Sequence, residues 1–187
     1  MKRKLHYNSP VILTVFFLSL AVLGLDWLTK GWTTLHLFSV YRSPITPLWF
    51  VRLFGHVLGH SGYAHFAGNM VLLLVVGPPM EERYGSRSLL AGILFTALIS
   101  GLLQCFLFPG YALLGASGIV FMLILLSSLS GMKSGTIPLT LILVAIIYLG
   151  QEIYAGLFVA DNTAHFMHLA GGVCGTGFGF LVRKKNQ

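Results

Sequence analysis

The sequence has 187 residues, of which 56% are hydrophobic and only 9% are charged, and its mean hydropathy is +0.83. Soluble domains carry about 25% charged residues, so this composition excludes a water-soluble globular domain. The formal net charge of +7 does not indicate nucleic-acid binding, because the basic residues flank the apolar segments. Those at the two ends are Lys2, Arg3 and Lys4 before the first segment and Arg183, Lys184 and Lys185 after the last.

Six apolar segments follow one another along the chain, and we expect each to span the membrane as a helix. They cover residues 10–25, 63–77, 88–108, 117–130, 137–159 and 164–182. A cleavable signal peptide is the alternative for the first segment, but Asp26-Trp27-Leu28 follows it in place of a small-residue cleavage site. The predicted fold is therefore an all-α membrane protein, one domain over residues 1–187 with basic tails at 1–9 and 183–187.

The connection at residues 26–60 mixes aromatic residues with prolines and basic residues. This mixture is typical of the membrane interface, so an interfacial loop is expected between the first two helices. With six spans and the N-terminus inside, nine of the twelve Lys and Arg residues fall in inner segments and three in outer ones. Because cytoplasmic segments carry the excess of positive charge, both ends are predicted to lie inside and this loop outside.

Three polar clusters interrupt the apolar segments near the predicted outer ends of the second, fourth and sixth helices. Polar groups within the membrane are costly and are functional candidates for that reason. The clusters are His60, His65 and Asn69; Gly115, Ser117 and Gly118; and His165, His168, Gly171 and Gly175. Each cluster alone is compatible with ordinary packing, but the predicted topology places all three on the same side of the membrane and at a similar depth.

These residue types together can hydrolyse an acyl bond. A serine hydroxyl is a weak nucleophile until a base accepts its proton, and histidine has a suitable pKa for this role. The oxyanion that forms needs preorganised donors, which His65, Asn69 and a backbone N–H can supply. Glycines at positions 171 and 175 leave one helix face free of bulk, which allows His168 to approach Ser117. None of the five acidic residues is placed to orient His168, so a Ser117–His168 dyad is predicted.

The chain resembles the rhomboid intramembrane serine proteases from about residue 52 to residue 183. The spacing His60-x4-His65-x3-Asn69 is similar to the family's second-helix signature, and Gly115-x-Ser117-Gly118 to its nucleophile motif. His168-x2-Gly171-x3-Gly175 is similar to the sixth-helix motif with the general base, which selects His168 over His165. The resemblance implies that Ser117 and His168 are catalytic, that His65, Asn69 and the Ser117 backbone form the oxyanion hole, and that Glu81 and Arg83 brace an inner loop.

Two positions depart from the family pattern. Val51 precedes Arg52 where the family often has tryptophan, and Phe121 stands where an aromatic hydroxyl commonly packs on the catalytic histidine. Phenylalanine can stack on an imidazole but cannot donate a hydrogen bond. We therefore expect altered tuning of His168 with activity retained.

The resemblance implies hydrolysis of peptide bonds in or near transmembrane segments of membrane-anchored substrates, with no metal or cofactor. The expected partners are transmembrane protein substrates and the lipid bilayer, and the expected location is a bacterial plasma membrane with the site near the outer face. Two alternatives remain open. A metal-binding or ion-transporting protein would use the histidines at positions 56, 60, 65, 165 and 168. A rhomboid-like protein without protease activity would bind and escort membrane proteins.

Overall fold

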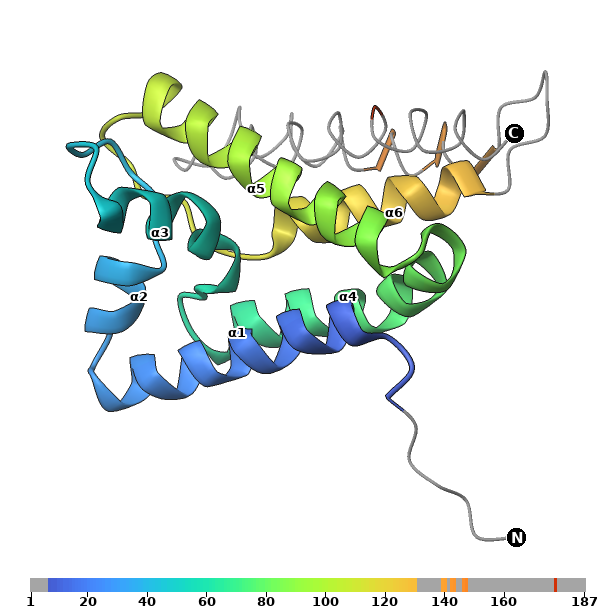
Figure 1. Ribbon diagram of the computed structural model, residues 1–187, viewed down its shortest axis with the longest axis horizontal. Coiled ribbons are helices and arrows are strands. Elements are labelled where there is room, and N and C mark those ends of the chain that lie inside the picture. Colours follow the sequence, from blue (N-terminus) through green and yellow to red (C-terminus); the bar gives the residue numbers. More distant parts are fainter. Residues whose placement is uncertain (1–6, 131–138, 141, 144–145, 148–176, 178–187) are drawn as a thin grey trace, which may run out of the picture.

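The computed structural model describes residues 7–130, 139–140, 142–143, 146–147 and 177. In this part the helices are α1 (Pro10–Leu28), α2 (Trp32–Leu37), α3 (Pro47–Gly55), the 3-10 helix η1 (His56–Leu58), α4 (Tyr63–Tyr84), α5 (Ser86–Leu107) and α6 (Ser117–Ser130). Figure 1 shows α1 beside α4, with α5 across from α1 and with α2 and α3 at one end of the arrangement. The predicted fifth and sixth spans lie almost wholly outside the described residues.

Three of the described helices are long and apolar enough to cross a membrane. They are α1, α4 and α5, whose most apolar windows have mean hydropathies of 2.3, 1.2 and 2.1. At 1.5 Å per residue, the 22 residues of α4 and of α5 extend over about 33 Å, enough to cross a hydrocarbon core of about 30 Å. For the described residues, the prediction of an all-α membrane protein is confirmed.

Helix α6 lies in the interior of the described part of the chain. It packs on α4 and α5, and its side chains Ile119, Met122, Leu123 and Leu126 are fully buried. Its buried positions surround the helix, which is the pattern of a helix enclosed by others. Ser117 is therefore the first residue of a buried helix that packs on α4 and α5.

The second segment was expected to end at residue 77, before Pro78 and Pro79, but this is wrong, since α4 continues to Tyr84. A proline inside a helix lacks the N–H donor and costs about 3 kcal/mol, so this extension of about two turns must be held by other contacts. It carries Met80 and Glu81, which are 4% and 3% exposed. The helix ends at Tyr84, and the next residue, Gly85, has a φ of +79° that favours glycine.

The buried carboxylate of Glu81 joins α4 to the start of α1. Its two oxygens accept the backbone N–H groups of Val11 and Ile12 at 2.9 and 3.0 Å, and one of them also accepts the Ser86 hydroxyl at 2.7 Å. The first N–H groups of a helix have no partner within the helix, and a negative charge at this end is favoured. One turn before Glu81, a Cβ on Gly77 would lie 2.6 Å from Ile12 Cδ1, so the glycine lets the two helices meet.

Two short helices and the 3-10 turn order the predicted interfacial loop. The Arg52 side chain is 8% exposed; its Nε donates to the His36 carbonyl at 2.7 Å, and its guanidinium lies 4.5 Å from the centre of the Tyr41 ring. Stacking of a cation on an aromatic ring stabilises such a contact. The arginine therefore ties α3 to α2, while the neighbouring Val51 is 50% exposed and takes no part in this contact.

Candidate active site

Ser117 is the first residue of α6 and is half-buried. Backbone hydrogen bonds to the connection between α1 and α4 hold the segment before Ser117 in place. Leu113 and Val40 exchange two backbone hydrogen bonds of 2.9 Å, and the Gly115 N–H donates to the His56 carbonyl at 2.9 Å. These bonds hold the backbone on which the serine is carried.

His65 and Asn69 lie one turn apart in the first half of α4, on one face of the helix. The Ser61 backbone N–H donates to His65 Nδ1 at 3.4 Å, and the Ser61 hydroxyl lies 3.1 Å from the same atom. Because Nδ1 accepts, the ring proton is assigned to Nε2. His65 therefore presents an N–H donor on the side of the ring opposite Ser61, and Asn69, which is 8% exposed, presents an amide.

Gly115 brings the α4 cluster and the serine segment together. A Cβ on this glycine would lie 2.8 Å from His65 Nε2 and 3.7 Å from Asn69 Nδ2. Both donors therefore face the backbone two residues before Ser117, and only a residue without a side chain fits between them. The φ of Gly115 is +116°, a conformation that other residues rarely adopt.

Replacing Gly115 with alanine is expected to destabilise the protein by about 2–4 kcal/mol, from backbone strain and from the clash with His65. The matched control is Gly110→Ala in the same connection, because a Cβ on Gly110 meets nothing within 4 Å. Thermal unfolding in detergent should show a lower midpoint for the first variant and an unchanged midpoint for the second. Equal midpoints for Gly115→Ala and the wild type would contradict the close approach of His65.

A strip of polar residues on α5 was not predicted as part of the site. Thr96, Ser100 and Gln104 recur every fourth residue, so they share one helix face, and they are 1%, 4% and 0% exposed. His56 Nε2 lies 3.3 Å from Ser100 Oγ, and the Ser100 hydroxyl donates to the Thr96 carbonyl at 2.7 Å. The signal was available in the sequence, because polar residues at this spacing interrupt an otherwise apolar helix.

A narrow cavity of about 10 Å³ lies between this strip and the serine. His56, Thr96, Ser100, Gly115 and Ser117 are among the residues that line it. Its volume corresponds to about one water molecule, and polar groups are present on its walls. The cavity therefore connects the polar face of α5 with the first turn of α6.

Burial keeps two histidines of the connecting loop uncharged. Burial lowers the pKa of His56 to about 4, and burial together with the nearby His65 lowers the pKa of His60 to about 4. Both imidazoles are therefore neutral at pH 7. The Nδ1 of His60 donates to the Leu58 carbonyl at 3.1 Å, and its ring meets the His65 ring edge to face with centroids 5.1 Å apart. His60 thus supports the ring that faces Gly115.

The histidines of the metal alternative are only partly described. His56 makes contacts with Leu53 and Ser100 through its two nitrogens, and His60 and His65 pack by their rings. Within the described residues, no three side chains of metal-ligand type gather around one point. His165 and His168 lie outside these residues.

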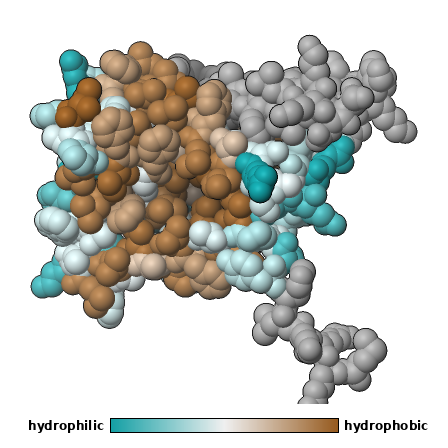
Figure 2. Space-filling view, in the orientation of Figure 1, coloured by the Kyte–Doolittle hydropathy of each residue, from teal (hydrophilic) through white to brown (hydrophobic). Residues whose placement is uncertain are grey.

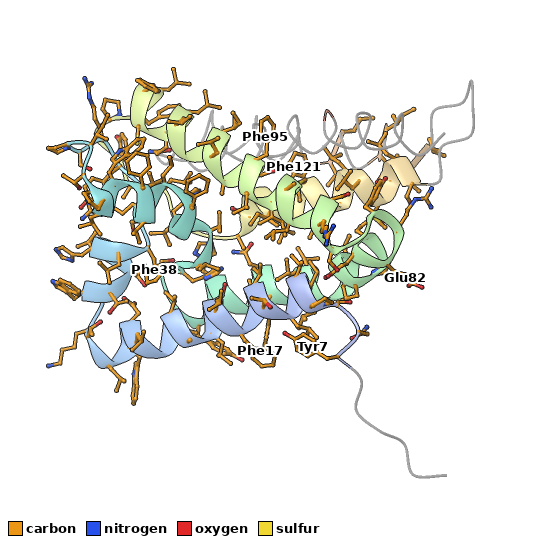
Figure 3. All side chains as sticks on the ribbon, viewed as in Figure 1. Tyr7, Phe17, Phe38, Glu82, Phe95 and Phe121 are labelled. Atoms are coloured by element: carbon orange, nitrogen blue, oxygen red, sulfur yellow. The ribbon has the colours of Figure 1, made fainter. Side chains whose placement is uncertain are left out.

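The remaining predicted residues take the following places. Gly118 is half-buried in the first turn of α6 and lines the cavity beside Ser117. Phe121 is 5% exposed on α6 (Figure 3), one turn after the serine. Arg83 is exposed at the end of α4, unlike the buried Glu81 two residues earlier.

His168, Gly171 and Gly175 lie outside the described residues, so their relation to Ser117 stays a prediction.

Comparison with known proteins is independent of the geometry. The model of the rhomboid domain matches residues 48–185. Rhomboid-related protein 2 of Mus musculus is 28% identical over 174 residues, which cover 82% of this chain and 56% of the relative. Rhomboid-related protein 1 of Caenorhabditis elegans is 30% identical over 141 residues, 70% of this chain and 39% of the relative.

A bacterial relative is also found. Rhomboid protease GluP of Bacillus subtilis (strain 168) is 36% identical over 128 residues, which cover 65% of this chain and 24% of the relative. The chain thus spans about half or less of the length of these relatives. The rhomboid domain accounts for most of the chain, and its apolar helices make it a multi-pass membrane protein. The chain belongs to the rhomboid family.

Proposed function

We propose that the protein is an intramembrane serine endopeptidase. It hydrolyses peptide bonds in or near transmembrane segments of membrane-anchored proteins, and Ser117 and His168 form its catalytic dyad. The proposal includes a six-helix bundle with both ends inside, in a bacterial plasma membrane, with the site near the outer face. Neither a metal nor a cofactor takes part.

The observation that carries this proposal is the meeting of His65 and Asn69 with the backbone at Gly115. Both side chains are hydrogen-bond donors, and both face the segment that leads into Ser117. An oxyanion hole requires donors that are held in place before charge develops. The hydrogen bond from the Gly115 N–H to the His56 carbonyl, and the contact of His60 with His65, hold this backbone and these donors in place.

In the proposed reaction, Ser117 Oγ attacks the carbonyl carbon of the substrate while His168 takes the hydroxyl proton. The carbonyl oxygen becomes an anion and is bound by His65, Asn69 and the Ser117 backbone N–H. His168 then gives the proton to the leaving amine as the C–N bond breaks, leaving an acyl ester on the serine. A water molecule, deprotonated by His168, hydrolyses this ester, and the serine regains its proton.

The test is cleavage of a tagged single-span substrate by the purified protein in liposomes, together with labelling by a serine-directed fluorophosphonate. Cleavage and labelling are both expected, and both should persist in the presence of a metal chelator. Loss of cleavage on chelation would favour the metal alternative. A folded protein that neither cleaves a panel of such substrates nor reacts with the probe would favour the role of an escort without protease activity.

A further inference from the structure

A groove of about 370 Å³ lies on the face formed by α1, α3 and α5, apart from the candidate active site. One wall is the first half of α1, including Val11 and Leu18, and the other is the first half of α5, including Leu90 and Leu94. The volume is within the range of ligand pockets, about 300–1,000 Å³. Figure 2 shows that this face is largely apolar, while hydrophilic residues gather at the end where α1 and α5 begin.

The groove runs along only about a third of the roughly 30 Å of hydrocarbon that a membrane helix crosses. Both walls begin at the same level, because Glu81, five residues before Ser86, binds the first backbone N–H groups of α1. From Val11 to Leu18 a helix rises about 10 Å. Beyond this point the helices diverge, and α3 and η1 lie between them (Figure 1), with Phe54 and Val57 among the groove residues.

This length excludes a transmembrane helix as the occupant. Such a helix needs about 20 residues to cross about 30 Å of hydrocarbon and is about 10 Å wide. Neither a substrate helix nor a helix of a second copy could lie along its whole length in a groove that α3 closes after about 10 Å. A flexible hydrocarbon chain that belongs to one leaflet fits these limits.

The polar groups at the open end indicate the head group. Thr14 and Ser86 are the residues with hydroxyl groups among those that line the groove, and the Ser86 hydroxyl already donates to the Glu81 carboxylate. The Tyr7 hydroxyl lies 3.5 Å from Thr14 Oγ1, and tyrosine is enriched at the level of lipid head groups. Arg87 follows Ser86 and is exposed, as is Arg83.

In the sequence, five basic residues flank the starts of α1 and α5, against two acidic residues, Glu81 and Glu82. The basic residues are Lys2, Arg3, Lys4, Arg83 and Arg87. Basic residues beside a membrane attract anionic lipids. We propose that the groove holds an acyl chain of an anionic phospholipid from the leaflet at the Ser86 end. This proposal concerns lipid binding and does not depend on the protease reaction.

The test uses liposomes of phosphatidylcholine that contain a small fraction of phosphatidylglycerol with a photoreactive diazirine in its acyl chain. After illumination, mass spectrometry of the peptides should place the label on the first halves of α1 and α5. Leu18→Trp fills the groove and should lower this labelling severalfold. The matched control is Leu20→Trp on the same helix, since Leu18 and Leu20 are 49% and 43% exposed but only Leu18 lines the groove.

A second variant tests the charge. Arg87→Gln should lower labelling of the groove by about fivefold, the factor for one cation at an anionic surface. The same diazirine on phosphatidylcholine should label the groove less than the phosphatidylglycerol probe.

Equal groove labelling in Leu18→Trp and Leu20→Trp, at equal melting temperatures, would overturn the site. Equal labelling by the two lipids would overturn its anionic preference, and cross-links between copies at Leu18→Cys would place a second chain there instead.

Discussion

Replacing Ser117 with alanine is expected to abolish both substrate cleavage and fluorophosphonate labelling while the fold is retained. Loss of a nucleophile in a serine hydrolase lowers the rate by about 10³–10⁶-fold, since no other group forms the acyl bond. The change removes one oxygen from a half-buried side chain at the start of α6, so the melting temperature should move little. Cleavage rate, probe labelling and thermal unfolding are measured on the same preparation.

Ser100→Ala is the matched control for this variant. Ser100 lies beside a histidine, with its Oγ 3.3 Å from His56 Nε2, so it forms a Ser–His pair outside the proposed dyad. Its hydroxyl is 4% exposed and donates to a backbone carbonyl, which makes it a structural group and not a nucleophile. Fluorophosphonate labelling should persist in Ser100→Ala. Labelling that survives in Ser117→Ala and vanishes in Ser100→Ala would show that the wrong serine was assigned.

The base is tested in the same series. His168→Ala should lower cleavage to the level of Ser117→Ala, and the double variant should be no worse, because the two residues act as one unit. His165→Ala, three residues earlier, should retain most of the activity, since the glycine spacing selects His168. A fully active His168→Ala protein would contradict the dyad.

The sequence predicted well what depends on local pattern. The low charge and the apolar segments identified a helical membrane protein, and the fourth segment begins at Ser117 as expected. The end of α4 could not be predicted, because two prolines normally stop a helix and their cost is offset here by tertiary contacts of Met80 and Glu81. Helix ends depend on such contacts more than helix centres do.

The site was predicted only in its motif residues. Spacing grouped His65 with Asn69, but no local pattern shows that the Gly115 backbone lies against them, since this contact joins residues about 50 positions apart. The polar strip of Thr96, Ser100 and Gln104 belongs to no motif, so only its regular spacing within an apolar helix could have indicated it. The place of His168 relative to Ser117 remains a prediction.

Glu81→Ala is expected to lower the free energy of unfolding by about 3 kcal/mol, the largest stability effect among the variants of acidic residues. The substitution leaves the N–H groups of Val11 and Ile12 without their acceptor. A donor left unsatisfied costs about 1–3 kcal/mol, and a lost helix cap about 1 kcal/mol. Unfolding is followed by tryptophan fluorescence in mixed micelles with increasing denaturing detergent.

The neighbouring Glu82 provides the matched control. It is exposed, and Figure 3 shows it at the periphery of the molecule near the end of α4. Glu82→Ala removes the same charge from the same turn and should change the unfolding free energy by less than about 0.5 kcal/mol. Glu81→Gln, which keeps one oxygen acceptor, should lie between Glu81→Ala and the wild type. Equal stability of Glu81→Ala and Glu82→Ala would show that the carboxylate does not hold α1.

The stability variants also separate structural from catalytic roles. Glu81 joins α1 to α4, and α4 carries His65 and Asn69 in its other half. A looser α1 should therefore reduce activity only as the population of folded protein falls. At temperatures well below its unfolding transition, Glu81→Ala should cleave substrate at nearly the wild-type rate, whereas Ser117→Ala should be inactive at every temperature. An inactive but fully folded Glu81→Ala protein would instead indicate that α1 sets the position of the α4 donors.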